Sequence, residues 1–331
     1  GRFVQLDDGR FLALTEQLRR QIEEFKGFGD RKKTGSLRFP AAHAGMFENL
    51  AGVKIKADAH WKSMLERMRA AQQLEPKTPH GFLAEMRDYQ EDGYKWMARL
   101  AAWGVGGCLA DDMGLGKTIQ ALAMLMERAT GPALVIAPTS VVFNWAAEIQ
   151  RFAPTLRPRM VAEEAASDEL TDLQPNDVVL CSYGLLQHRT AMLKATSWNT
   201  LILDEAQAIK NATTQRSQSA KSLQANFRMI MTGTPIENHL GELWNLMDFI
   251  NPGMLGSAEV FQQRFAIPIE RDQCRQTKSR LKKLISPFLL RRTKAQVLSE
   301  LPSRTEITLH VTMSPQETAF YEALRQQAVK K

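Results

Sequence analysis

The amino-acid sequence predicts an α/β fold in which a mostly parallel sheet is flanked by helices. Three observations support this fold: short apolar runs alternate with helical stretches, each run ends in a polar turn, and one run leads through a glycine-rich loop into a helix. The runs are rich in Val, Ile, Leu and Met, as in parallel strands that are buried on both faces. They are the run that ends before residue 111, then ALVIAP, DVVLCSYG, TLILDEA and FRMIMTGTP.

Residues 1–82 are predicted to form an N-terminal accessory region. RFVQLDDGRFLAL alternates well enough for a short hairpin that turns at Asp8-Gly9. A helix is expected to begin at Thr15, which is a suitable N-cap residue. GFGDRKKTGS is expected to be a loop, WKSMLERMRAAQQL a second amphipathic helix, and EPKTPHGF a linker.

Residues 83–250 are predicted to form the α/β part, and residues 251–331 a helical extension. The α/β part opens with a helix, MRDYQEDGYKWMARLAAWG, and contains all the apolar runs. Past Phe249 the pattern changes to helices and loops, with one strand expected in TEITLHVTM. Ser314 and Glu317 have the spacing of a capping box at the start of a final helix.

Composition limits the class of protein. No apolar run approaches the length of a membrane span, and the three cysteines form no metal or disulfide pattern. These features favour a protein of the reducing cytoplasm, and we expect a monomer. The chain begins with Gly, which we interpret as a processed or excised piece. The net charge is +7, and the segment from Arg271 to Lys294 holds nine basic residues against one acid. Such a basic face is typical of a polyanion partner, although a solvated helix face is an equally good interpretation.

The glycine-rich loop between residues 110 and 118 is the strongest chemical signal. It reads DDMGLGKT and opens into a helical pattern, so its backbone N–H groups would converge at a helix N-terminus and attract phosphate. Lys117 would reach the β and γ phosphates of a nucleotide, and the Thr118 hydroxyl would bind Mg²⁺. Asp111 replaces the first glycine of G-x-x-x-x-G-K-[ST], and the string is closer to A-x-x-G-x-G-K-T. A tight strand–helix turn without a ligand is the structural alternative.

Two adjacent acids, Asp204 and Glu205, follow the run TLIL. We expect Asp204 to hold Mg²⁺ and Glu205 to orient and deprotonate an attacking water. Adjacent acids also occur as mere helix caps, but their combination with GKT favours a metal site. In MTGTP, Thr232 and Thr234 could sense the γ-phosphate and hydrogen-bond Glu205, or form a simple turn before proline.

Other polar side chains are weaker candidates. The amide of Gln90 could pair with adenine as donor and acceptor, although a helix-surface glutamine is common. Hydroxyl, amide and aromatic groups at two strand ends suit sugar-phosphate contacts that carry no sequence information. These groups are Thr139, Asn144, Ser182 and Tyr183. Trp145 fits a core position equally well.

Together these strings resemble a known family. YQ near residue 90, DDMGLGKT, APTSVVFNW, DEAQ, MTGTPIENHLGELW and PFLLRRTKAQVLSELPS are similar to the Swi/Snf-type ATPases of helicase superfamily two, from about Leu83 to the end. The resemblance implies a RecA-like lobe that uses ATP and Mg²⁺ to translocate on double-stranded DNA without separating its strands. It implies a phosphate loop of Met113, Gly114, Leu115, Gly116, Lys117 and Thr118, an adenine contact at Gln90, and a coupling motif of Thr232, Gly233 and Thr234. DNA contacts are also expected at Lys282, Lys283, Arg291 and Arg292.

Two departures from the family pattern matter. Gln207 stands where many members have His, so the link between the attacking water and the coupling motif is amide-based here. The second RecA-like lobe, which in the family supplies an arginine to the reaction, is missing, so this chain alone is expected to turn over ATP slowly. The first 75 residues resemble the N-terminal accessory region of bacterial members. We expect a nucleoid-associated protein of the cytoplasm.

Two other functions remain open at this point. One is a strand-separating DNA or RNA helicase of the same superfamily. The other is a scaffold that docks on RNA polymerase or another DNA-bound protein and keeps only a vestigial nucleotide site. The four intact residues Lys117, Thr118, Asp204 and Glu205 argue against the scaffold.

Overall fold

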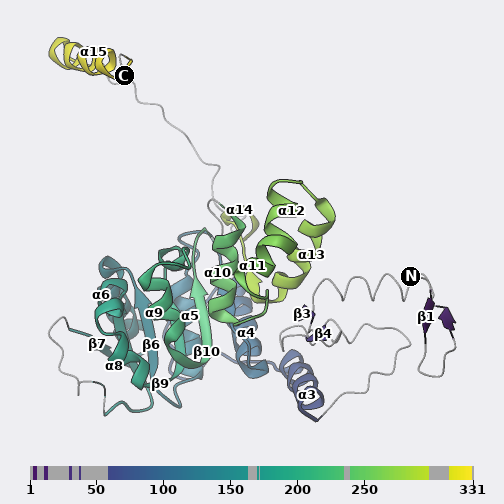
Figure 1. The fold of residues 1–331 in the computed structure, drawn as a ribbon. Coiled ribbons are helices and arrows are strands. Elements are labelled where there is room, and N and C mark those ends of the chain that lie inside the picture. Colours follow the sequence, from purple (N-terminus) through teal and green to yellow (C-terminus); the bar gives the residue numbers. More distant parts are fainter. Residues whose placement is uncertain are drawn as a thin grey trace. The chain divides into compact units, whose positions relative to one another are not determined.

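The computed structural model describes residues 59–162, 170, 172–234, 239–297 and 313–329, together with four short strands nearer the N-terminus. The chain divides into two compact units, Gly1–Val297 and Leu298–Lys331. The sheet and all the elements around it belong to the first unit (Figure 1). The predicted boundaries near residues 82 and 250 remain predictions. Within the described parts of the chain, no helix combines the length and the apolar character that spanning a bilayer requires.

The first unit is built around a seven-stranded sheet with the order β11-β5-β10-β9-β6-β8-β7. Every neighbouring pair in this sheet runs parallel. The strands are β5 (Gly107–Leu109), β6 (Ala133–Ala137), β7 (Arg157–Met160), β8 (Asp177–Ser182), β9 (Ser197–Leu203), β10 (Gln224–Met231) and β11 (Leu289–Leu290). The predicted α/β fold with a parallel sheet is therefore confirmed.

The five apolar runs form the five central strands, and both edge strands were not predicted. In β5, β6 and β8 every residue is buried, which explains their continuous apolar sequences. β7 is the sequence RPRM, whose residues are all at least partly exposed, so no apolar run marks it. β11 is only two residues long and lies in the segment that was expected to be helix and loop.

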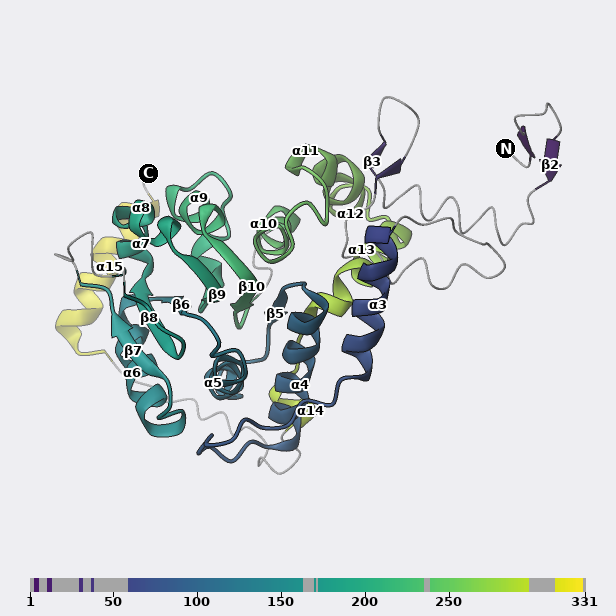
Figure 2. The same cartoon turned by 90° about the horizontal axis from the view of Figure 1, so that it is seen from below.

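Helices cover both faces of the sheet (Figure 2). One face carries α4 (Asp88–Trp103), α5 (Lys117–Glu127) and α6 (Thr139–Phe152). The other carries α7 (Tyr183–His188), α8 (Thr190–Ala195), α9 (Gln215–Ser222) and α10 (Leu240–Ile250). Large side chains, among them Trp145, Trp198, Tyr94 and Phe249, are fully buried between the layers. Burial of each such side chain stabilises the fold by roughly 1.5–3 kcal/mol.

Between α10 and β11 the chain makes a group of short helices. They are α11 (Ala258–Phe261), a π-helical turn (Gln262–Ala266), α12 (Ile267–Glu270), α13 (Arg275–Ile285) and a 3₁₀ turn (Ser286–Phe288). The helical character predicted past Phe249 is confirmed for this part. The chain then returns to the sheet, because β11 pairs with β5, and continues into α14 (Lys294–Val297).

The N-terminal predictions have mixed outcomes. β1 (Phe3–Gln5) and β2 (Phe11–Ala13) pair antiparallel, as the hairpin prediction requires. The expected loop GFGDRKKTGS instead contains β3 (Asp30–Arg31), which pairs with β4 (Leu37–Arg38). The helix predicted from WKSMLERMRAAQQL is α3 (Ala59–Gln73), which packs against α4. The helix expected to begin at Thr15 lies outside the described residues.

The second unit contributes one described helix, α15 (Pro315–Val329). The Ser314 hydroxyl accepts a hydrogen bond from the Glu317 backbone N–H at 3.3 Å, and the Glu317 carboxylate accepts one from the Ser314 N–H at 2.9 Å. The predicted capping box is therefore confirmed. The strand expected in TEITLHVTM falls almost entirely on residues that the structure does not describe.

Candidate active site

Three neighbouring strands bring the predicted motifs to one edge of the sheet. β5 lies beside β10, and β10 beside β9, with Leu109 opposite Met231 and Leu203 opposite Ile230. Because the strands are parallel and in register, the glycine-rich loop, the two acids and the TGT motif all begin at the same level. The Thr232 backbone N–H donates to the Leu109 carbonyl at 3.1 Å, which joins two of these loops directly.

The glycine-rich loop has the backbone shape of an anion cradle. Gly114 and Gly116 have φ angles of +82° and +72°, which glycine adopts without steric cost. Gly116 is the N-cap of α5, and no side chain caps the first turn of that helix. The N–H groups of this turn have no partner within the helix, so they are available to a phosphate. Leu115, between the two glycines, is fully buried and anchors the loop.

Lys117 folds back across the loop. Its Nζ donates to the carbonyl of Asp111 at 2.7 Å and to that of Asp112 at 3.4 Å. The lysine charge also acts on Asp204, where it is one of the influences that lower the carboxyl pKa. Among the influences on this pKa, that of Lys117 is the smallest.

Asp204 is buried and accepts three hydrogen bonds. Trp145 Nε1 donates to its Oδ2 at 2.9 Å, the Glu205 N–H donates to its Oδ1 at 2.9 Å, and the Tyr183 hydroxyl donates to its backbone carbonyl at 2.9 Å. Burial raises the pKa of the Asp204 carboxyl, and the hydrogen bond from Trp145 is the strongest influence in the opposite direction. The sequence marked Trp145 only as a possible core residue, because nothing local shows that its indole N–H reaches an acid 59 positions away.

A continuous hydrogen-bonded chain joins Glu205 to the TGT motif. Gln207 Nε2 donates to Glu205 Oε2 at 2.8 Å, and the Thr232 hydroxyl donates to Gln207 Oε1 at 3.0 Å. The Thr234 backbone N–H in turn donates to the Thr232 hydroxyl at 3.1 Å. Glu205 has a φ of +47°, a strained conformation for a residue other than glycine and one that occurs often at active sites. In each of these three hydrogen bonds, the acceptor is the group nearer to the Glu205 carboxylate along the chain of bonds.

Gln90 is engaged with the glycine-rich loop. Its Nε2 donates to the Leu115 carbonyl at 3.1 Å, and its Oε1 accepts from the Arg87 N–H at 2.9 Å. The Tyr89 hydroxyl donates to the same Leu115 carbonyl at 3.1 Å. A side chain at Gly116 would collide with this amide, because an added Cβ would lie 2.3 Å from Gln90 Nε2. The adenine contact predicted for Gln90 stays a prediction.

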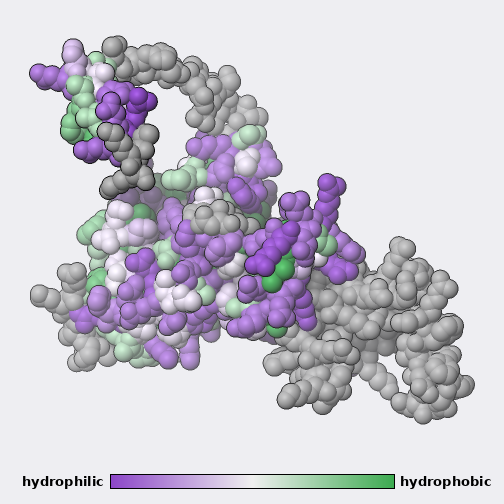
Figure 3. Space-filling view, turned by 45° about the horizontal axis from the view of Figure 1, so that its top comes forward, coloured by the Kyte–Doolittle hydropathy of each residue, from purple (hydrophilic) through white to green (hydrophobic). Residues whose placement is uncertain are grey.

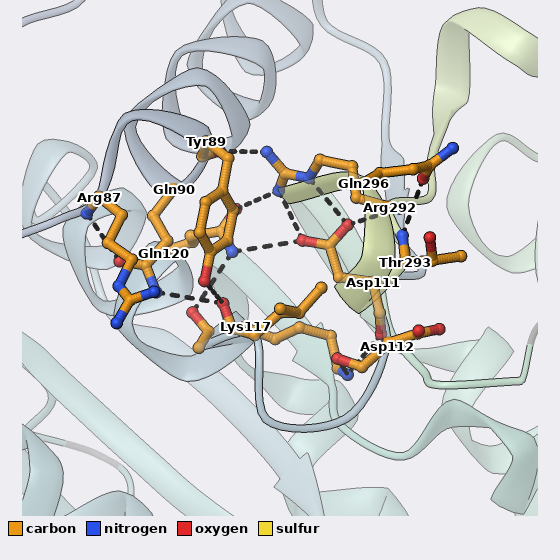
Figure 4. Close-up of polar contacts among 12 residues, drawn as sticks. Arg87, Tyr89, Gln90, Asp111, Asp112, Lys117, Gln120, Arg292, Thr293 and Gln296 are labelled. Carbon is orange, nitrogen blue, oxygen red and sulfur yellow. Dashed lines mark hydrogen bonds and ion pairs between the residues drawn. The ribbon is translucent and has the colours of Figure 1, made fainter. Parts of the chain in front are cut away.

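Arg292 differs most from its predicted place. Figure 4 shows its guanidinium turned toward the carboxylate of Asp111, inside the protein. Nε donates to Oδ1 at 3.0 Å and Nη2 to Oδ2 at 2.5 Å, and Nη2 also donates to Gln120 Oε1 at 2.9 Å. The Arg292 side chain is 12% exposed and that of Asp111 is 0% exposed. A DNA contact by Arg292 therefore does not fit the structure, because its donors are used within the fold.

The other predicted DNA contacts separate into two groups. Ser182 and Tyr183 are buried: the Ser182 hydroxyl caps α7, and the Tyr183 hydroxyl binds the backbone of Asp204. The remaining side chains are exposed; they are Thr139, Asn144, Lys282, Lys283 and Arg291. Hydrophilic residues predominate over the described surface in the view of Figure 3. Only the exposed group is placed where a DNA backbone could reach it.

Two further residues of the glycine-rich motif are Met113 and Thr118. Met113 is 69% exposed, and its Cγ would lie 3.3 Å from a Cβ added at Gly233. The glycine-rich loop and the coupling motif are thus in close approach at this point. Thr118, in the first turn of α5, is half-buried beside Lys117. The roles predicted for Met113 and Thr118 stay predictions.

The donor set fits a nucleotide with Mg²⁺ better than a metal bound by protein alone. Among the described residues, no group of three or more His, Cys, Asp or Glu side chains could hold a metal ion. Mg²⁺ is usually bound through one or two carboxylates together with substrate phosphates and water. Asp204, with the Thr118 hydroxyl close to the phosphate cradle, matches that arrangement.

An all-parallel sheet with a phosphate cradle and two acids at one edge defines a RecA-like ATPase lobe. The SNF2-related domain family matches residues 89–331, and the chain belongs to this family. It is 40% identical over 285 residues to YwqA of Bacillus subtilis (strain 168), an ATP-dependent helicase/translocase by name. That match covers 83% of this chain and 31% of YwqA.

Solved structures give the same result. The Sulfolobus solfataricus SWI2/SNF2 ATPase core in complex with double-stranded DNA superposes with a TM-score of 0.63 at 39% identity. The match covers 76% of this chain and 54% of that one. A second structure, of the Sulfolobus solfataricus SWI2/SNF2 ATPase core domain, gives a TM-score of 0.62, also at 39% identity, and the match covers 78% of this chain and 54% of that one. The chain thus spans about half of the solved cores and about a third of YwqA.

Proposed function

We propose that the chain is the first motor lobe of an ATP-dependent translocase that moves along double-stranded DNA. In this proposal the lobe binds ATP with Mg²⁺ at the edge of β5, β9 and β10. The nucleotide supplies the phosphoanhydride bond, and Mg²⁺ supplies positive charge that the reaction needs as negative charge develops. The observation that carries the proposal is the hydrogen-bonded chain from Glu205 through Gln207 and Thr232 to Thr234.

Each residue of the site has a defined task in this proposal. The first turn of α5 and Lys117 bind the phosphates, and Asp204 with Thr118 holds Mg²⁺. Glu205 orients the attacking water and accepts its proton, for which its carboxylate must be ionised. The Gln207 amide donates to Glu205 Oε2 at 2.8 Å and holds that carboxylate in position. The structural change that follows loss of the γ-phosphate would then reach the TGT motif through Gln207.

Support for a double-stranded DNA substrate comes from charge and from relatives. The basic helix α13 exposes Arg275, Lys278 and Lys282, and backbone phosphates account for most of the affinity in non-specific DNA binding. The similar Sulfolobus solfataricus core is in complex with double-stranded DNA. We also propose RNA polymerase or another DNA-bound protein as a partner. Translocation along the DNA would act on that partner.

Two measurements test the proposal. The 331-residue chain should bind ATP in the presence of Mg²⁺, and Lys117→Ala should remove that binding. Its turnover should be slow, because an arginine from a second lobe contributes on the order of a thousandfold or more to phosphoryl transfer in related enzymes. Full DNA-stimulated hydrolysis by this chain alone would contradict the need for that arginine.

The substrate is tested on the complete motor. Translocation is measured by displacement of a third strand from a DNA triplex, and strand separation by release of one strand from a duplex. Triplex displacement without duplex separation supports the translocase. Duplex separation without movement along intact duplex would instead support a strand-separating helicase.

A further inference from the structure

Lys294 lies directly over the glycine-rich loop, although it is 177 residues further along the chain than Lys117. A Cβ added at Gly114 would lie 3.7 Å from both Cε and Nζ of Lys294. Gly114 is exposed at this point of the loop, and so is Lys294. The ammonium group therefore lies close to Gly114, one of the two glycines that shape the phosphate cradle.

The backbone around Lys294 is fixed to the loop by several hydrogen bonds. The Lys294 N–H donates to Asp112 Oδ2 at 3.1 Å, and the Asp112 N–H donates to the Arg292 carbonyl at 3.0 Å. Two residues earlier in both segments, the Ala110 N–H donates to the Leu290 carbonyl at 2.7 Å. Lys294 is thus held at a defined place on the loop and is not an isolated surface lysine.

The charges around the loop leave the Lys294 ammonium available. Asp111 is already neutralised by Arg292, as Figure 4 shows. Asp112 accepts the backbone N–H of Lys294, and within the described residues no carboxylate forms an ion pair with the Lys294 side chain. A free ammonium beside unpaired helix N–H groups is complementary to a chain of phosphates.

We propose that Lys294 is a second lysine that binds the phosphate chain of the nucleotide. The nucleotide site is then composite: one part comes from the loop after β5 and the other from the segment after β11. This inference rests on the proposed function, since it assumes that the cradle binds a nucleotide. In this proposal, the pairing of β11 with β5 contributes to nucleotide binding as well as to the fold.

The test measures nucleotide affinity by isothermal titration of the 331-residue chain with ADP and with ATPγS, each in the presence of Mg²⁺. Lys294→Ala should weaken binding by about tenfold, as expected for one lost charge-assisted hydrogen bond. Lys294→Arg should retain most of the affinity, because it keeps the charge. The melting temperature without nucleotide should be unchanged in both variants, since the Lys294 side chain is exposed.

Two further variants separate the possible failures. Lys62→Ala removes an exposed lysine of α3 and should bind nucleotide as the unmodified chain does. If Lys117→Ala abolishes binding while Lys294→Ala does not change it, the inference is wrong and the proposed function stands. If Lys117→Ala also binds normally, the proposed function itself fails. A Lys294→Ala variant that loses affinity only for duplex DNA would overturn the inference and make Lys294 a DNA contact.

Discussion

The guanidinium of Arg292 pairs through two parallel hydrogen bonds with the carboxylate of Asp111, 181 positions earlier in the chain. Asp111 opens the glycine-rich loop, and Arg292 follows the edge strand β11. The pair therefore ties the segment that leaves the sheet to the loop that we propose binds phosphate.

The first prediction concerns the stability of this pair. Arg292→Ala should lower the free energy of unfolding by about 3–5 kcal/mol, because it leaves the carboxylate of Asp111 buried without its partner. Arg292→Lys should recover only part of the loss, since lysine cannot form two parallel bonds. Urea denaturation measures both changes. The control is Arg291→Ala, at the exposed neighbour, with an expected change within about 0.5 kcal/mol. Equal effects at the two positions would contradict the assignment.

The second prediction concerns Trp145 and the pH dependence of Mg²⁺ use. The Trp145 hydrogen bond lowers the pKa of Asp204 against the rise that burial causes. Trp145→Phe removes that influence, so the pKa of Asp204 should rise further and the ionised form should require a higher pH. More Mg²⁺ should then be needed for half-maximal nucleotide binding, most clearly toward acid pH. Titrations with Mg²⁺ at several pH values measure the shift.

Trp198 offers a matched control for Trp145. It is equally buried, and its indole N–H donates to the carbonyl of Leu193, far from the acids in the sheet. Trp198→Phe should reduce stability without changing the Mg²⁺ requirement at any pH. If both substitutions shift the Mg²⁺ requirement alike, Trp145 acts only through packing.

The third prediction concerns the amide of Gln207. Gln207→Ala should leave nucleotide affinity nearly unchanged and slow single-turnover hydrolysis of ATP by about tenfold or more, because Glu205 loses its hydrogen-bond donor. Gln207→His should restore part of the rate, since an imidazole ring can donate on one side and accept on the other. Gln218→Ala, in the exposed part of α9, serves as the control. A normal rate in Gln207→Ala would exclude the hydrogen-bonded chain from the reaction.

The fourth prediction concerns the basic helix α13. Replacing Lys282 and Lys283 by Glu should weaken duplex binding and reduce its salt dependence by about 0.9 units of log–log slope per lost phosphate contact. The affinity of the chain for a short duplex, measured by fluorescence anisotropy at several salt concentrations, gives the slope. Lys62→Glu, on α3, makes one such charge reversal outside the basic segment. An unchanged slope in the Lys282 and Lys283 variant would remove α13 from the DNA interface.

The local elements and the kinds of chemistry in the site could be predicted from the amino-acid sequence alone. β6, β8, β9 and β10 could be predicted because continuous apolar runs are typical of buried parallel strands. The cradle could be predicted because glycine is needed where φ is positive, as it is at Gly114 and Gly116. Such features depend on residues that are near one another in the chain, so a single sequence contains them.

Contacts between residues that are far apart in the sequence could be identified only from the folded structure. β11 is a strand because the edge of β5 offers unpaired backbone groups, although LL alone carries no strand signal. Arg292 is internal because that pairing carries it to Asp111, and Trp145 binds Asp204 because β6 and β9 are neighbours. These contacts follow from strand order, which local periodicity does not specify. The neighbouring sequence therefore does not show whether a charged or aromatic side chain faces solvent or the centre of the site.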